Sequence, residues 1–296
     1  MGGAAFSDAA ASHPASARAG WRAWLLLAPL LVWLGVFVAL PTALLILTSF
    51  SQRDFLGRVV YDFTLENYLR CFDATWLTIF GNSILYAFLA TVICVVVGYP
   101  AAYTIGRAAP ATRRLLLTLV MIPFWTSFLI RTYAWISILS EQGLANSLLL
   151  SSQIFTQPLP MMYTAFSIVL GLVYNYLPFM ILPIYTSVEK LDNSLIEAAY
   201  DLGAGPVRAF SRVIIPLTRP GIAAGALLVF VPAIAMYAIT TLMGGSNHQT
   251  IGEVIQNQFT KARNQPFGAT LGVLLMLLFL ASFLILGRKK KTSQTA

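Results

Sequence analysis

The chain has few charged residues. Only 10% of its 296 residues are Asp, Glu, Lys or Arg, whereas 58% are hydrophobic and the mean hydropathy is +0.75. An ordinary soluble domain carries about 25% charged residues. So few charges cannot cover a water-facing surface, which argues against a soluble enzyme or a nucleic-acid-binding protein. The formal net charge of +8 therefore needs an explanation other than a polyanionic partner.

Residues that carry out catalysis or bind metals are also scarce, because there are only two cysteines and two histidines. Cys71 falls in a predicted loop and Cys94 inside an apolar run, so neither a disulfide nor a metal site is expected. His13 and His248 are isolated in the sequence. The phosphate-binding pattern GxxxxGK[ST] is missing as well. We therefore expect no enzyme activity, no bound cofactor and no ATPase site in this chain.

Long stretches almost free of charge recur along the sequence. A helix that crosses the hydrocarbon core needs roughly 20 mostly apolar residues, and a helix satisfies its own backbone hydrogen bonds there. A β-barrel would instead show short alternating segments. The sequence predicts an all-α, polytopic membrane protein with a transmembrane domain at 23–287 and six spans, near 24–48, 79–105, 115–139, 162–187, 221–243 and 267–286.

The basic residues indicate which loops face the cytoplasm, where Lys and Arg are retained. With the N-terminus inside, five basic residues fall in outer loops and thirteen fall inside. The inner ones are Arg18, Arg22, Arg107, Arg113, Arg114, Lys190, Arg208, Arg212, Arg219, Arg288, Lys289, Lys290 and Lys291. Both termini are therefore expected in the cytoplasm, with a disordered tail at 1–22 and a basic tail at 288–296. The basic tail could alternatively contact lipid headgroups or nucleic acid.

The inner loop at 194–216 has a defined pattern. Ser194 and Glu197 have the spacing of a capping box, and Gly203 suits a helix C-terminus. Pro206 suits the first turn of a second helix that runs towards Pro216. The loop thus predicts a compact helix–turn–helix. In the first outer loop, at 50–78, Thr64 is expected to cap a short helix, either as an ordered connector or as a partner contact.

The same loop carries a motif. Glu197-Ala198-Ala199 is followed after three residues by Gly203, and then by Val213, Ile215 and Pro216. This pattern resembles the EAA loop of ABC-importer permeases, with conservative substitutions at 213 and 215. The resemblance implies a type I importer fold in which the loop is a coupling helix seated on an ATPase subunit. By this resemblance the docking residues are Glu197, Ala198, Ala199, Gly203 and Pro216.

Other segments resemble the spermidine/putrescine branch of these permeases, among them 98–103, 123–126, 129–135, 242–245 and 266–268. The resemblance implies a subunit of the bacterial inner membrane that works by alternating access. The implied partners are two copies of an ATPase that binds ATP, a second related permease, a periplasmic solute-binding protein, a small solute and membrane lipid.

Polar and aromatic residues within the spans are candidates for the translocation pathway. An ionisable group in a membrane is expensive and usually functional, so Arg131 serves either as a structural anchor or as part of a gate. Aromatic ring faces attract organic cations, although rings near span ends also form interfacial belts. The pathway candidates are Trp125, Arg131, Tyr174, Asn175, Tyr176, Tyr237 and Thr240.

No acidic residue is predicted near the middle of the membrane, although a polycation would benefit from one. Span five has Tyr237 to Thr241 where members of the polyamine branch often carry an acid. Three explanations are open. Either a partner subunit supplies the acid, or hydroxyls and aromatic rings bind the solute without it, or the solute is not a polyamine. In the last case it is an amino-acid derivative, an opine, a metal ion or another organic cation. The competing class of function is a passive channel or a membrane enzyme.

Overall fold

The computed structural model describes residues 21–292, so most of the predicted N-terminal tail and the last four residues lie outside the described residues. The chain divides into two compact units, the first ending at Leu47 and the second beginning at Thr48. Helix α1 starts at Trp21, so the last two residues of the predicted tail are helical. Among the described residues, five helices are long and apolar enough to cross a membrane, and one bent helix pair brings the total to six. This agrees with the predicted number of spans.

The described part of the first unit is a single helical segment with a local irregularity. It consists of α1 (Trp21–Leu34), the π-helical turn η1 (Gly35–Ala39) and α2 (Leu40–Ser49), whose last two residues belong to the second unit. The N–H of Leu40 donates to the oxygen of Gly35, five residues back. Pro41 follows directly and has no N–H to continue the ordinary pattern, which explains why the widened turn occurs here.

The first loop of the second unit is ordered. Strands β1 (Gln52–Arg53) and β2 (Val59–Val60) pair antiparallel, and α3 (Glu66–Arg70) follows. The N-cap of α3 is Leu65 and not Thr64 as expected, although the hydroxyl of Thr64 accepts a hydrogen bond from the N–H of Glu66, the first residue of the helix, at 3.2 Å. Ser49 and Tyr68 share a hydrogen bond of 2.7 Å between their hydroxyls. The loop is therefore a structured connector.

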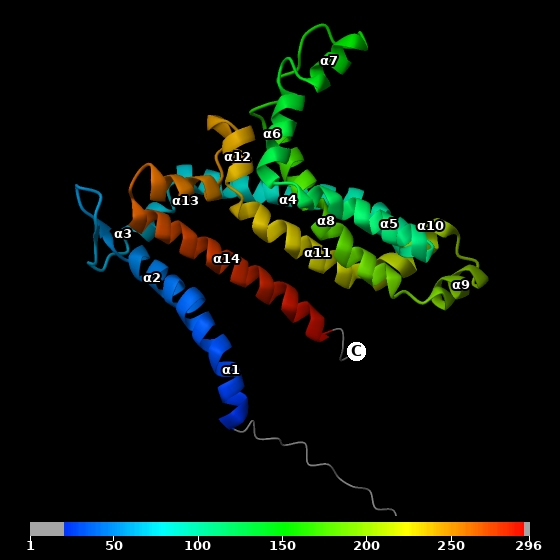
Figure 1. Cartoon of the computed structure of the whole chain (residues 1–296), viewed down its shortest axis with the longest axis horizontal. Coiled ribbons are helices and arrows are strands. Elements are labelled where there is room, and N and C mark those ends of the chain that lie inside the picture. Colours follow the sequence, from blue (N-terminus) through cyan, green and yellow to red (C-terminus); the bar gives the residue numbers. More distant parts are fainter. Residues whose placement is uncertain (1–20, 293–296) are drawn as a thin grey trace, which may run out of the picture. The chain divides into compact units, whose positions relative to one another are not determined.

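Three long helices pack side by side as the core of the second unit: α4 (Ala74–Arg107), α8 (Ala165–Glu189) and α11 (Ile215–Ala235) (Figure 1). Small residues allow the close approach. A Cβ added at Gly221 would lie 2.3 Å from Ser187 Oγ, and one added at Gly225 would lie 2.8 Å from the sulfur of Met180. Gly221 and Gly225, at the start of span five, therefore allow α11 to pack closely on α8.

The third span is not the single helix predicted at 115–139. It contains α5 (Pro110–Met121), the 3₁₀ turn η2 (Ile122–Trp125), α6 (Phe128–Leu139) and α7 (Leu144–Ser151), and the chain bends by 89° at the break. Thr126 takes an extended conformation there, and its N–H donates to the oxygen of Pro123. Because Pro123 cannot donate, the helix loses a hydrogen bond beside the bend.

The fifth span, predicted at 221–243, is also interrupted. Helix α11 ends at Ala235, Met236 is extended, and a separate helix α12 runs from Ala238 to Met243. The turn η4 (Ser246–His248) and helix α13 (Ile251–Thr260) follow, and α13 packs against the break. Helix α14 (Gln265–Thr292) completes the second unit. Its backbone stays helical past 287, so the start of the predicted basic tail continues the last helix.

Candidate functional site

The first part of the loop motif, Glu197-Ala198-Ala199, lies on helix α9 (Asn193–Asp201). The predicted capping box of Ser194 and Glu197 is wrong, because the carboxylate of Asp192 caps this helix. It accepts a hydrogen bond from the N–H of Ser194 at 2.9 Å. This bond lowers the pKa of Asp192 below its usual value. The cap therefore stabilises the helix above the ordinary carboxyl pKa, and this contribution is lost as the pH falls through the lowered value.

The other end of α9 closes as predicted. Gly203 has φ +78°, a left-handed conformation that glycine adopts without strain. Its N–H donates to the oxygen of Tyr200 at 2.9 Å, and the N–H of Ala204 donates to the oxygen of Ala199 at 3.0 Å. These two bonds form a Schellman motif. The chain therefore reverses sharply at a fixed position after α9.

The second helix of the loop is the start of span five. Helix α10 (Pro206–Ala209), the π-helical turn η3 (Phe210–Ile214) and α11 follow one another without a break. The N–H of Ile215 donates to the oxygen of Phe210, and Pro216 follows directly. The geometry is that of the turn before Pro41, and the missing proline N–H accounts for both. The predicted separate second helix is therefore part of one long helix that enters the membrane domain.

The tip of this loop is exposed. Leu202 and Val207 have exposed fractions of 89% and 80%, and both are apolar. Of the predicted docking residues, Glu197, Ala198 and Gly203 are exposed, Ala199 is half-buried, and Pro216 is half-buried at the start of α11. A depression lies beside the turn, lined by Gly203, Gly205, Pro206, Val207, Arg208, Ser211 and Arg212. Isolated exposed apolar residues are common, but here they adjoin this hollow and suit contact with another protein.

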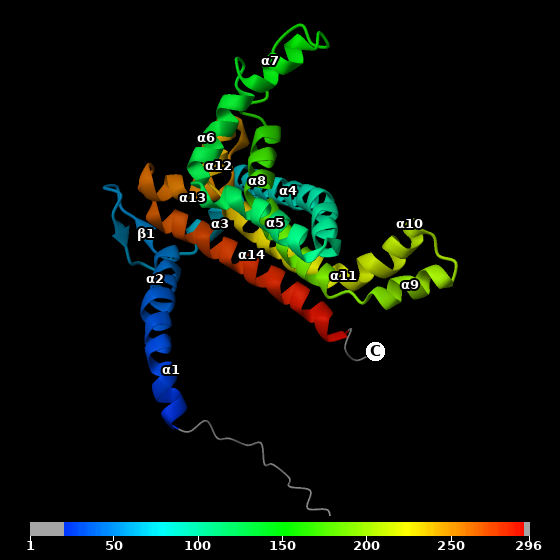
Figure 2. The same ribbon diagram turned by 45° about the vertical axis from the view of Figure 1, so that its right-hand side comes forward.

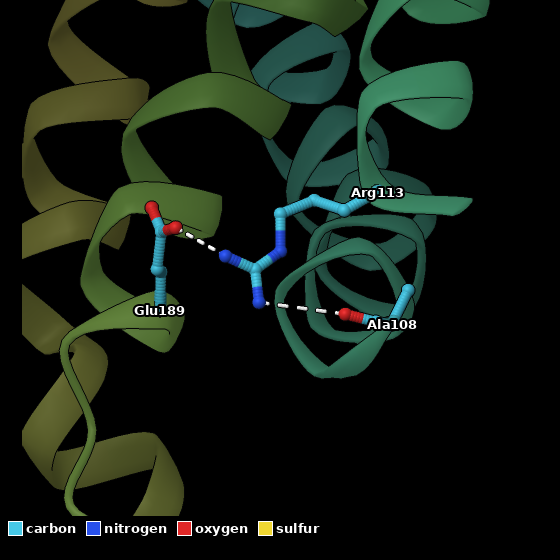
Figure 3. Close-up of polar contacts among 3 residues, drawn as sticks. All are labelled: Ala108, Arg113 and Glu189. Atoms are coloured by element: carbon cyan, nitrogen blue, oxygen red, sulfur yellow. Dashed lines mark hydrogen bonds and ion pairs between the residues drawn. The ribbon is translucent and has the colours of Figure 1, made fainter. Parts of the chain in front are cut away.

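Two arginines join the base of this loop to helices earlier in the chain. Figure 3 shows Arg113 of α5 between the Glu189 carboxylate, at 2.5 Å, and the Ala108 carbonyl, at 3.4 Å. Arg107, near the end of α4, donates to the side chain of Asn193, the first residue of α9. The sequence indicated these arginines only as topology signals, and no pattern revealed their partners.

An aromatic cluster fixes the far arm of the loop. The ring of Phe210 in η3 meets the rings of Tyr99 and Tyr103 edge to face, with centroids 5.4 and 6.0 Å away. The Tyr99 hydroxyl also shares a hydrogen bond of 2.9 Å with the hydroxyl of Thr218 in α11. Helix α4 thus contacts the loop both at the first residue of α9 and at η3.

Arg131 spans the break in the third span. Its Nη1 donates to the oxygen of Pro123 at 2.9 Å, so it binds a carbonyl on the far side of the bend. The guanidinium lies 5.1 Å from the ring centre of Phe124 and 6.0 Å from that of Tyr174, and Tyr174 contacts Trp135 edge to face at 5.5 Å. The anchoring interpretation of Arg131 is therefore supported by direct contacts.

The remaining pathway candidates are divided between two places. Asn175 and Tyr176 continue along α8, where the Tyr176 hydroxyl donates to the oxygen of Pro232 at 3.4 Å. Tyr237 and Thr240 lie at the α11–α12 break; Tyr237 is 48% exposed, whereas Thr240 is buried and bonded to the hydroxyl of Thr250 at 3.0 Å. Trp125, at the end of η2, is 80% exposed.

Several known proteins resemble this chain. It is 42% identical to the spermidine/putrescine transport system permease protein PotB of Escherichia coli over 88% of this chain and 94% of that protein. It is 41% identical to the PotB of Haemophilus influenzae over 88% and 91% of the two chains. In fold it matches a chain of a bacterial alginate ABC transporter, solved in complex with a periplasmic protein, with a TM-score of 0.72 and 16% identity over 90% and 92% of the two chains.

The expected all-α fold of an ABC-importer permease is confirmed by this structural match. A family model described as the binding-protein-dependent transport system inner membrane component matches residues 95–289, which include α9 and its flanking helices. The chain therefore belongs to the family of inner membrane components of binding-protein-dependent transport systems.

Proposed function

We propose that this chain is the membrane-spanning subunit of an ATP-driven polyamine importer. The proposal rests on the sequence identity of 42% to a spermidine/putrescine permease, which extends over 88% of this chain and 94% of that protein. Spermidine and putrescine are flexible organic cations, and the spans of this chain are rich in aromatic rings, which attract such cations. ATP would be bound by a separate ATPase.

The coupling step would take place at α9. In this proposal two ATPase subunits close on binding ATP, and one of them pulls on Glu197, Ala198, Ala199 and Gly203. The loop lies at the cytoplasmic face together with both termini. The contacts of Arg107 and Arg113 would carry the movement to α4 and α5, so that packed helices move as rigid bodies.

The translocation pathway would pass the two broken spans. Tyr174 and Arg131 line it at the bend between η2 and α6, with Trp125 at the end of η2. Asn175, Tyr176, Tyr237 and Thr240 line it where α8 faces the interrupted fifth span. The complex would also contain a second related permease and a periplasmic binding protein that delivers the solute to the outer face. Other small solutes, and a passive channel without an ATPase, are the outcomes that the following experiments distinguish.

The first experiment tests the coupling role. The chain is co-expressed with the ATPase subunit proposed as its partner, and Glu197→Ala is compared with the wild type for co-purification and ATP-dependent uptake of labelled spermidine. Glu197 is exposed and free to bind a partner. We expect at least a tenfold loss of uptake or ATPase association.

The matched control is Asp201→Ala, which removes an exposed carboxylate from the last turn of the same helix. It should leave both measurements within twofold of the wild type. A Glu197→Ala complex with full association and full ATP-dependent uptake would contradict the assigned role. Uptake that needs no ATPase would favour the channel.

The second experiment tests the pathway. Tyr174→Ala and Tyr237→Ala remove rings that are 36% and 48% exposed and thus available to a solute or a partner subunit. We expect uptake to fall several-fold while ATPase assembly is unchanged. Tyr61→Ala, in the first loop and 76% exposed, is the control. Unchanged uptake kinetics in both span variants would remove these rings from the pathway.

A further inference from the structure

The interrupted fifth span is flanked by polar atoms that lack partners. A break in a membrane helix is tolerated where the backbone lines a cavity or is buried in protein. Here α13 packs against it: a Cβ added at Gly252 would lie 2.3 Å from the oxygen of Ala235 and 3.3 Å from the nitrogen of Tyr237. Only glycine permits this approach, and it brings the start of α13 against the break.

The residue that follows Gly252 is an acid. Oε2 of Glu253 is buried and has no hydrogen-bond partner among the described residues. Oδ1 of Asn257 is also buried and also has no hydrogen-bond partner among the described residues. Residues four apart on a helix lie on one face, so α13 presents two unpartnered acceptor oxygens about one turn, roughly 5.4 Å, apart along its axis.

Helix α8, which packs on α11 and α12, carries another unpartnered acceptor. Gly171 of α8 packs on Ile239 of α12, where an added Cβ would lie 2.9 Å from the side chain. Tyr176 contacts Pro232 of α11. Asn175 lies between them and is 6% exposed; its nitrogen donates to the oxygen of Gly171, while its Oδ1 has no partner among the described residues.

These atoms share one chemical property, because all three are acceptors and one belongs to a carboxylate. Buried acceptors are normally paired in native proteins, so the unpaired oxygens of Glu253 and Asn257, on one face of α13, need an explanation. Burial raises the pKa of Glu253 above its ordinary value, and Lys261 opposes this rise without forming an ion pair within 4 Å. A bound cation would give the Glu253 carboxylate the partner that it lacks among the described residues.

Resting on the proposed function, we propose that Glu253 and Asn257 form a binding site for an ammonium group of a polyamine entering the pathway. A primary ammonium is a compact cation with three N–H donors and no acceptor, which matches a carboxylate and an amide oxygen on one helix face. Helix α13 lies at the opposite end of the second unit from α9 (Figures 1 and 2), so this is the entrance side if α9 faces the ATPase. Glu253 thus supplies the acid that the spans lack.

The test uses the complete importer, with its ATPases and binding protein, in proteoliposomes. Glu253→Gln keeps the size and removes the charge, whereas Glu253→Asp keeps the charge. We expect Glu253→Gln to lower the maximal rate of spermidine uptake at least tenfold and Glu253→Asp to retain more than a third of it. ATP hydrolysis without solute should be unchanged in both. The matched control is Glu141→Gln, which changes an exposed carboxylate in the connection between α6 and α7.

A second variant tests the site independently of whether Glu253→Gln folds. Asn257→Asp adds a carboxylate one turn from Glu253, so it should shift the ratio of spermidine to putrescine uptake at least threefold towards the more highly charged spermidine. A Glu253→Gln complex with a normal uptake rate, or an unchanged ratio in Asn257→Asp, would overturn the site. A wild-type importer that carries no polyamine would instead overturn the proposed function.

Discussion

Gly203 shows how one residue determines the shape of the loop at 194–216. Its φ of +78° ends α9 and turns the chain towards Pro206. An alanine in a left-handed conformation costs roughly 1–2 kcal/mol. We expect Gly203→Ala to loosen the end of α9, seen as faster hydrogen exchange at the amides of Gly203 and Ala204, and to lower coupled uptake several-fold.

Gly205 is the matched control for this substitution. Its φ is −70°, and an added Cβ would have no neighbour within 4 Å. Gly205→Ala should therefore leave exchange and uptake near the wild-type values. Equal effects of the two substitutions would mean that loop flexibility, and not the left-handed turn, governs the behaviour of this segment.

At the scale of helices, packing between α8 and α11 depends on small residues. A Cβ at Gly221 would lie 2.3 Å from Ser187 Oγ and 2.6 Å from the oxygen of Pro183, which as a backbone atom cannot move aside easily. Overpacking of this kind typically costs about 1–3 kcal/mol. We expect Gly221→Ala to lower the unfolding temperature of the purified subunit in detergent.

Gly81 in α4 provides the comparison, because no atom lies within 4 Å of its added Cβ. Replacing a helical glycine with alanine normally stabilises by about 0.5–1 kcal/mol. Gly81→Ala should therefore raise the unfolding temperature or leave it unchanged. A Gly221→Ala protein as stable as the wild type would show that the two helices separate readily, and that their close contact contributes little.

The sequence predicted the existence of these helices better than their interruptions. Uncharged runs long enough to cross a bilayer are a direct consequence of membrane solvation, and Gly203 signalled a helix end by itself. The bend after Pro123 and the gap at Met236 were not predicted, because helical propensity does not show which proline breaks a helix and which only bends it. Pro100 and Pro178 both lie within continuous helices.

In the candidate site, too, local features were easier to predict from the sequence than contacts between distant residues. Of the motif residues on α9, Glu197 and Ala198 are exposed and Ala199 is half-buried. Asp192 caps the helix instead of Ser194. Because Asp192, Asn193 and Ser194 are all residue types that cap helices, the sequence alone does not decide among them. The partners of Arg107, Arg113 and Arg131 come from distant parts of the chain, and a single sequence carries no information on such pairs.

At the scale of the whole molecule, Arg113 joins the α4–α5 connection to the end of α8 at the base of the loop at 194–216. The ion pair of Arg113 and Glu189 is partly exposed, with side-chain exposures of 27% and 38%. Such pairs contribute only about 0–1 kcal/mol to stability. The expected importance of this pair lies in transmitting movement, since α8 leads directly into α9 while α5 leads to the broken third span.

Reversing the charge of Glu189 distinguishes a role of this ion pair in stability from a role in transmitting movement. Glu189→Arg places two cations together, so we expect a several-fold loss of ATP-dependent uptake with at most a small change in unfolding temperature. The double variant Arg113→Glu with Glu189→Arg restores opposite charges and should recover most of the uptake. Because salt screens partly exposed pairs, wild-type coupling should also weaken as ionic strength rises. If the double variant remains as inactive as Glu189→Arg, the geometry of the arginine fork, including its contact with Ala108, matters more than the pairing of charge.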